Sequence, residues 1–201
     1  MKIPPPPVLP EGRGLFNMDV LPCYYLAPVS YYSALFRAEE AMIEVNDHYR
    51  KQTLRNRCMI DSPQGALALS IPVVKPEPHA LMRDIRISDH GNWRHLHWNA
   101  LQSSYRQSPF FEYYADDFAP FYEKKWDFLC DFNEDLLRLV CSLIDIDTPI
   151  SRTDAYAGEQ PAFPQAEKPY YQVFARKHGF LQDLSIVDLL FNMGKEGILW
   201  L

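Results

Sequence analysis

The chain has few cysteines, and no pattern joins them into a site. Its 201 residues include four cysteines, and none stands in a CxxC motif or in a Cys/His spacing typical of metal sites. Cys130 and Cys141 lie about three helical turns apart, which suits two small apolar side chains on one helix face. We therefore expect no disulfide framework and no metal site, and we predict a reducing, cytoplasmic location.

Long apolar runs and basic runs are also missing. No window approaches the roughly 18 apolar residues that predict a transmembrane helix. The opening stretch MKIPPPPVLPEGRGLF lacks the apolar segment of a secretory signal, and we interpret residues 1–17 as a proline-rich flexible tail. The formal net charge is −6, and no basic cluster would neutralise phosphates along a strand. We therefore expect neither a membrane span nor nucleic-acid binding.

The sequence also lacks the Walker A, GxGxxG and GxSxG signatures of phosphate-binding loops and hydrolases. Aromatic residues, in contrast, are abundant. They make up 14% of the chain, with 12 Tyr and 12 Phe, and several stand in pairs such as Tyr24-Tyr25 and Tyr31-Tyr32. A buried tyrosine contributes a large apolar area, but its hydroxyl needs a partner. This composition indicates a polar-lined cleft or an interface, or alternatively an aromatic-rich core.

The first ninety residues predict a sheet. Residues 18–26 are apolar enough for a strand, residues 29–40 carry the apolar stripe of a helix, and residues 41–47 alternate as a second strand. Because a helix connects these strands, they should be parallel. Residues 53–60 and 66–74 flank the turn-rich DSPQG and predict a β-hairpin. The alternation of residues 82–88 predicts one further strand.

The second half of the chain predicts helices over residues 92–107, from Ser108-Pro109, over residues 133–146, and from Ser185 to a C-cap at Gly194. Residues 151–169 have no periodicity and predict a loop. We therefore expect an α/β (or α+β) fold in a single domain over residues 18–201. It has an N-terminal mixed sheet (18–90) with one βαβ crossover and one β-hairpin. The sheet packs against C-terminal helices (91–150), and a loop with a closing helix follows (151–201).

Arg55 and Arg57 stand close together in an acidic chain. In an extended strand they would share one face, about 7 Å apart, while Asn56 would point to the apolar side, where its amide needs partners. Two guanidiniums suit an anion such as the diphosphate of a nucleotide sugar. The alternative is an internal ion pair with one of three acids, Glu44, Asp47 or Asp84.

Three further side chains are candidates for chemistry. His97 shares a helix face with Trp93 and Leu101, so it faces inward as either a general base or a hydrogen-bonded core histidine. Tyr105 lies about two turns further along and would join the same pocket. Cys23 ends the first predicted strand, at the edge where α/β sheets bind ligands. As a nucleophile, its thiol would need a base such as His97.

Five motifs, made up of seven short stretches of the chain, follow one another in an order that is known from other proteins. They are LPCYYLAPVSYY (21–32), RNR (55–57) with LSIPV (69–73), WRHLHW (93–98) with YRQSPFF (105–111), YYQVF (170–174) and LSIVDLLFNMG (184–194). In content and order they resemble the WbqC-like family, small bacterial proteins often associated with polysaccharide and O-antigen gene clusters. Two positions depart from commoner members, since Leu21 replaces a glutamine and Asn46 replaces an aspartate.

The resemblance implies a role in cell-surface polysaccharide biosynthesis, including O-antigen and lipopolysaccharide, but no specific reaction or cofactor. The first hypothesis is an enzyme that transfers a small group to an activated sugar. Its substrate site would contain the side chains of Arg55, Asn56, Arg57, Cys23 and Tyr31. Its catalytic residues would be His97 and Tyr105.

The competing hypothesis is a non-catalytic binding or scaffold protein, which meets a pathway partner or a second copy of itself through an aromatic surface. A deep pocket lined by Arg57, His97 and Tyr105 would favour the enzyme. A flat, exposed aromatic patch would favour the binding protein.

Overall fold

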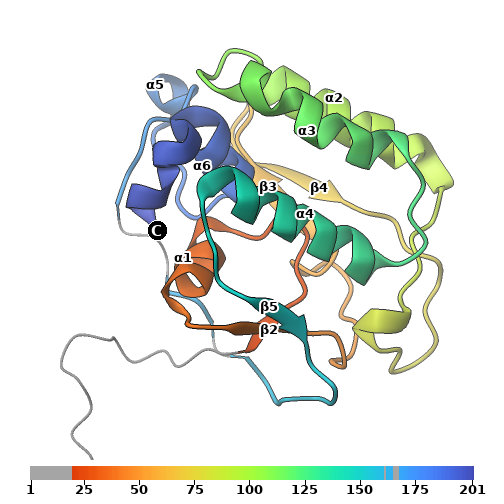
Figure 1. The fold of residues 1–201 in the computed structure, drawn as a ribbon. Helices are drawn as coiled ribbons and strands as arrows, with labels where there is room; N and C mark the ends of the chain where they lie inside the picture. The colour runs from red at the N-terminus through yellow and green to blue at the C-terminus, as the bar shows by residue number, and fades with distance from the viewer. Residues whose placement is uncertain (1–19, 161, 165–167) are drawn as a thin grey trace, which may run out of the picture.

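The computed structural model describes residues 20–160, 162–164 and 168–201, so the tail predicted for residues 1–17 lies outside the described residues. Within them the chain forms two β-sheets and six α-helices (Figure 1). The parallel sheet with α1 lies at one end of the molecule and helices α2 and α3 lie at the other, with α4 between them. The predicted α/β class is confirmed.

The first sheet has three parallel strands in the order β1-β2-β5. β1 (Val20–Pro22) leads through α1 (Val29–Arg37) to β2 (Ala41–Glu44), which confirms the predicted βαβ unit. β5 (Ile150–Arg152) pairs with the other side of β2. The prediction of a loop there was wrong, because three residues are too few to show a strand period. Since all three strands are parallel, their carboxyl ends meet at one edge of the sheet.

The predicted hairpin forms a separate antiparallel sheet of β3 (Arg57–Ile60) and β4 (Leu67–Ser70). The turn between them uses Gly65 at φ +102°, a conformation that suits glycine. The strand predicted for residues 82–88 was wrong. Met82 begins the 3₁₀-helix η1 (Met82–Asp84) and donates its backbone N–H to the carbonyl of Asp47 at 2.8 Å. The backbone of this segment therefore anchors the loop after β2. The rest of the segment pairs with its neighbours only through isolated β-bridges at Arg86 and Ile87.

The four helices predicted for the second half form with shifted starts, and a short helix at Ala175–His178, which the sequence did not predict, forms in addition. They are α2 (Trp93–Tyr105), α3 (Phe111–Glu123), α4 (Leu129–Ile144), α5 (Ala175–His178) and α6 (Ile186–Met193), with short 3₁₀-helices η2 (His90–Asn92) and η3 (Gly194–Trp200). α3 begins after the predicted Ser108-Pro109, and α4 begins four residues before the predicted 133. Its extra turn buries Leu129 and Phe132 completely. Asp131 in that turn complements the helix dipole.

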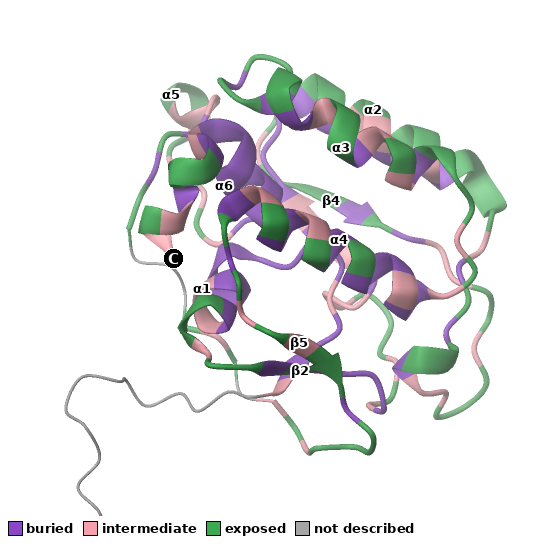
Figure 2. Cartoon of the chain, in the orientation of Figure 1, coloured by how far each residue is buried: buried purple, intermediate pink, exposed green. Residues whose placement is uncertain are grey.

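α4 contacts α3, α6, η1 and η3, so it lies in the middle of the core. Figure 2 shows its buried face turned toward the sheets and its exposed face toward solvent. Most tyrosines are buried in this core, namely Tyr25, Tyr31, Tyr32, Tyr105, Tyr114, Tyr122 and Tyr170. The abundance of aromatics therefore reflects mainly an aromatic-rich core, which was the alternative interpretation. Along the described part of the chain, no helix is both long and apolar enough to cross a bilayer.

Candidate functional site

A polar cavity of about 220 Å³ lies at the carboxyl ends of β1 and β2, and we call it the strand-edge cavity. Open α/β sheets bind their ligands at this edge, because the strands end there and their loops diverge. The lining comes from the ends of the two strands, the loop after β2, and the segment 158–160. It consists of Pro22, Cys23, Tyr24, Glu44, Asp47, Arg50, Arg55, Gly158, Glu159 and Gln160.

Glu44, the last residue of β2, is a buried carboxylate with only 2% of its surface exposed. Its Oε1 accepts hydrogen bonds from the backbone N–H of Asn46 at 2.7 Å and from the hydroxyl of Thr153 at 3.0 Å. Its Oε2 accepts the backbone N–H of Ala157 at 2.8 Å. All three donors are uncharged. A carboxylate offers about four acceptor sites, so these bonds fix its orientation and leave one site on Oε2.

Arg55 forms an ion pair with Asp47, and the side chains of the two residues are only 11% and 14% exposed. Asn133 donates its side-chain amide to the backbone carbonyl of Arg55 at 2.8 Å, and the backbone N–H of His48 donates to Asp47 at 2.7 Å. These bonds hold the pair inside the cavity wall. For Arg55 the structure therefore shows the internal ion pair that was the alternative to a socket for an anion.

Arg55 and Arg57 do not share a strand face, so that prediction was wrong. β3 begins only at Arg57, and Arg55 lies in the turn before it. The Nε of Arg57 donates to the hydroxyl of Ser70 across the hairpin at 2.8 Å. Arg57 is absent from the lining of the strand-edge cavity, whereas Arg55 belongs to it.

The charges of the cavity do not favour an anion. Three carboxylates line it against two guanidiniums, and each guanidinium is already paired. The second pair, Arg50 with Glu159 at 3.2 Å, is exposed, with side-chain exposures of 55% and 80%. Burial raises the pKa of the Tyr24 phenol, so this group keeps its proton and can donate it in a hydrogen bond. The lining therefore suits hydroxyl or ammonium groups of a ligand.

Two other residues that the sequence predicted for substrate binding lie outside the lining. Asn56 is buried, and it donates its side-chain amide to the carbonyl of Ile71 at 2.8 Å, which ties the start of β3 to the segment after β4. The ring of Tyr31 is buried and contacts Tyr24 at a centroid distance of 5.8 Å. It therefore lies one layer behind the cavity. Cys23 does line it, and the amide of Asn133 lies 3.7 Å from its Sγ.

His97 faces inward, but it contacts core side chains. It is 5% exposed, its Nδ1 lies 3.0 Å from the hydroxyl of Tyr25, and its ring packs against Trp93 at 5.1 Å. Burial lowers its pKa to about 4, so the imidazole is neutral at pH 7. It has the surroundings of the hydrogen-bonded core histidine that was the alternative to a general base.

Tyr105 has equally buried surroundings. Its hydroxyl donates to Asp188 at 2.9 Å and accepts the backbone N–H of Asp61 at 3.0 Å. Arg57, His97 and Tyr105 are all absent from the lining of the strand-edge cavity, so this cavity is not the pocket that would favour the enzyme. The site at the strand edge includes neither His97 nor Tyr105.

A model of the WbqC-like protein family matches residues 23–163, which is well over half of the chain. The chain belongs to the WbqC-like protein family. This WbqC-like protein is also similar to "Uncharacterized protein Rv1507c" of Mycobacterium tuberculosis (strain ATCC 25618 / H37Rv). The two are 27% identical over 215 residues, which cover 86% of this chain and 91% of the relative. No solved structure matches the chain. The matched range contains every residue of the strand-edge cavity except Pro22.

The sequence did not point to several residues that line the cavity of this WbqC-like protein. Glu44 and Asp47 entered only as possible partners of the arginines, although charged residues at a strand's carboxyl end are a signal for a site. Glu159 and Gln160 carried no signal, because the segment 158–160 reaches the edge only through the missed strand β5.

In the described ranges, no group of three or more His, Cys, Asp and Glu side chains could hold a metal ion.

Proposed function

We propose that this WbqC-like protein binds one sugar unit of a glycan precursor in the strand-edge cavity, as a step in cell-surface polysaccharide biosynthesis. The observation that carries the proposal is the buried carboxylate of Glu44 on a small polar cavity, with one acceptor site left for a ligand hydroxyl. The family resemblance supports the pathway.

The size of the cavity supports a small ligand. Its volume of about 220 Å³ falls below the roughly 300–1,000 Å³ of pockets that enclose drug-sized molecules. One pyranose ring suits this volume better than a whole nucleotide sugar. The excess of carboxylates over guanidiniums favours a neutral sugar or an amino sugar over a uronic acid, because like charges repel at short range in a poorly solvated site.

The enzyme form of the proposal is the transfer of a small group from an activated donor to a hydroxyl or amino group of the bound sugar, in which the donor's leaving group departs as the new bond forms. Glu44 would then accept the proton of the attacking group, since a general base must lie within hydrogen-bond reach of that proton. The competing form, a non-catalytic binding protein, has the same site and no turnover. Incubating the protein with a sugar and activated acyl donors, followed by mass spectrometry of the sugar, separates the two forms.

A thermal-shift panel of neutral sugars, amino sugars and uronic acids tests the binding itself. A ligand at one hundred times its Kd adds about 2.7 kcal/mol of stability, which raises Tm by about 5–10 °C in a chain of this size. We expect this rise for a neutral or amino sugar and a smaller rise for the matching uronic acid. The proposal fails if no sugar of the panel raises Tm.

Arg50→Ala and Arg86→Ala form a matched pair of variants for the same panel. Both side chains are 55% exposed, and each forms an exposed ion pair, with Glu159 and Asp127 respectively. Only Arg50 lines the strand-edge cavity. We expect Arg50→Ala to reduce the ligand-induced rise in Tm and Arg86→Ala to leave it unchanged. Equal effects of the two substitutions would show that the ligand binds elsewhere.

A further inference from the structure

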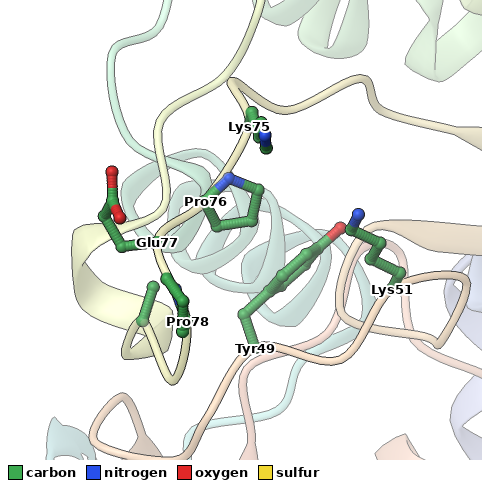
Figure 3. Close-up of a pocket in the computed structure, with 7 residues that line it drawn as sticks. Tyr49, Lys51, Lys75, Pro76, Glu77 and Pro78 are labelled. Atoms are coloured by element: carbon green, nitrogen blue, oxygen red, sulfur yellow. The ribbon is translucent and has the colours of Figure 1, made fainter.

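A second and larger cavity, of about 450 Å³, lies beside the loop that follows β2, and we call it the lysine groove. Tyr49 and Lys51 form one of its walls and residues 75–78 form the other (Figure 3). Its lining residues are Tyr49, Lys51, Lys75, Pro76, Glu77, Pro78 and Ala80. It shares none of them with the strand-edge cavity, although Arg50, between Tyr49 and Lys51 in the chain, lines that cavity.

Hydrogen bonds join the two walls of the groove. The backbone N–H of Tyr49 donates to the carbonyl of Ala80 at 2.9 Å, and the ring of His48 bonds the carbonyl of His79 at 2.8 Å. His48 also forms a β-bridge with Leu81. These bonds are part of the fold, and they fix the two walls of the groove to each other at one end.

The two lysines of the groove lack partners. Neither Lys51 nor Lys75 makes an ion pair, hydrogen bond or ring contact within the described residues. Every other lysine that the structure describes has such a contact, namely Lys124, Lys125, Lys168, Lys177 and Lys195. The arginines of the strand-edge cavity are also paired. Two unpaired ammonium groups against one carboxylate, that of Glu77, give the groove a local excess of positive charge in an acidic protein.

Apart from its charged side chains, the lining consists of an aromatic ring, two prolines and an alanine. Tyr49 presents a partly buried ring, and Pro76 and Pro78 lie on the opposite wall. Aromatic faces stack with nucleobases of any sequence, because every base has a π-face. The volume of about 450 Å³ lies within the roughly 300–1,000 Å³ of pockets that enclose a molecule of this size.

We infer that the lysine groove binds a nucleoside diphosphate, with the base against Tyr49 and the prolines and the phosphates beside Lys51 and Lys75. Each ammonium group offers three donors to phosphate oxygens as a point charge. This inference does not depend on sugar binding in the strand-edge cavity, because the two sites have separate linings. Glu44→Gln should therefore leave nucleotide binding unchanged.

Titration calorimetry with UDP, ADP, uridine and inorganic pyrophosphate tests the inference. We expect UDP or ADP to bind the wild type more tightly than uridine or pyrophosphate does. Lys51→Ala and Lys75→Ala should each weaken nucleotide binding about two- to fivefold, as the loss of an exposed ion pair does. Tyr49→Leu should weaken the binding of the nucleotides and not that of pyrophosphate.

Lys125→Ala is the control, because it removes the same charge from a side chain outside the groove. Lys125 forms an exposed ion pair with Asp89, and Asp89 keeps its second ion pair, with Arg94, in the variant. It should leave nucleotide binding unchanged. All four substituted side chains lie at the surface or are partly buried, so circular dichroism should show folded variants. The inference is overturned if neither nucleotide binds, or if the double variant Lys51→Ala/Lys75→Ala binds UDP and ADP as tightly as the control. It is also overturned if Tyr49→Leu leaves nucleotide binding unchanged.

Discussion

Glu44 and Asp188 are both buried carboxylates that accept hydrogen bonds from uncharged donors, yet they lie in different surroundings. Asp188 is 0% exposed and accepts hydrogen bonds from the hydroxyls of Tyr105 and Tyr170 and from the amide of Gln172, at 2.9, 2.7 and 2.9 Å. This network joins α2, α6 and the segment before α5 inside the core. Glu44 lies on a cavity at a sheet edge. Burial of an acid alone therefore does not mark a binding site, and access to a cavity distinguishes the two.

The largest effect is expected from Asp188→Ala. The substitution leaves two buried hydroxyls without their acceptor and removes one of the acceptors of the Gln172 amide, which should lower the free energy of unfolding by about 3–4 kcal/mol. Urea denaturation measures this loss. Asp188→Asn keeps the size of the side chain and one acceptor, so it should lose less. A loss below about 1 kcal/mol for Asp188→Ala would contradict a structural role for the network.

The pH dependence of stability distinguishes Asp188 from His97. Burial raises the pKa of Asp188 to about 6, so its contribution to stability is present below its unfolded pKa and is lost as the pH rises through 6. Burial lowers the pKa of His97 to about 4, so its contribution is present above its unfolded pKa and is lost as the pH falls through 4. Between pH 4 and 6.5 the two therefore oppose each other.

Asp188→Asn removes one of these opposing contributions. We expect the free energy of unfolding of this variant to rise with pH from 4 to 6.5 more steeply than that of the wild type, by about 3 kcal/mol over the window. Urea denaturation at a series of pH values measures both slopes. Parallel curves for the variant and the wild type would show that Asp188 does not titrate in this window.

Alanine substitutions of Arg55 and Arg57, which the sequence placed on one strand face, should lower the free energy of unfolding by different amounts. Arg55→Ala leaves the largely buried carboxylate of Asp47 without its cation, and we expect a loss of about 2–3 kcal/mol in the free energy of unfolding. Arg57→Ala removes a hydrogen bond to Ser70 and should cost less than about 1 kcal/mol. Chemical denaturation of both variants checks the order. Equal losses would indicate that the two guanidiniums act as one unit.

The sequence predicted the elements that have a clear period or a defined turn. The βαβ unit and the hairpin follow from alternation, an amphipathic helix and a turn-rich connection, all of them local signals. β5 was missed because its three residues pair through contacts with β2 more than a hundred positions earlier in the chain. The strand predicted for residues 82–88 does not form, because the backbone N–H groups of Met82 and Arg83 donate to carbonyls of the loop after β2.

The candidate site was predictable only in part, for the same reason. Cys23 was expected at the carboxyl edge of the first strand, and the cavity lies there. The inward orientation of His97 followed from helical spacing, but its partner Tyr25 lies 72 positions away and carried no local signal. The ion pair of Arg55 could be stated only as an alternative, since a strand period does not reveal which acid a turn brings near. Long-range contacts therefore decide which polar residues form a site and which stabilise the core.

Titration calorimetry of wild type and Glu44→Gln with the sugar that most raises Tm is the most direct test of a ligand at the strand edge. Glutamine keeps the size of the side chain and weakens its acceptor, so we predict at least about tenfold weaker binding, equal to about 1.4 kcal/mol. Asp188→Asn, which changes the other buried carboxylate in the same way, should bind the sugar as the wild type does. Unchanged affinity in Glu44→Gln would contradict a binding role for the cavity.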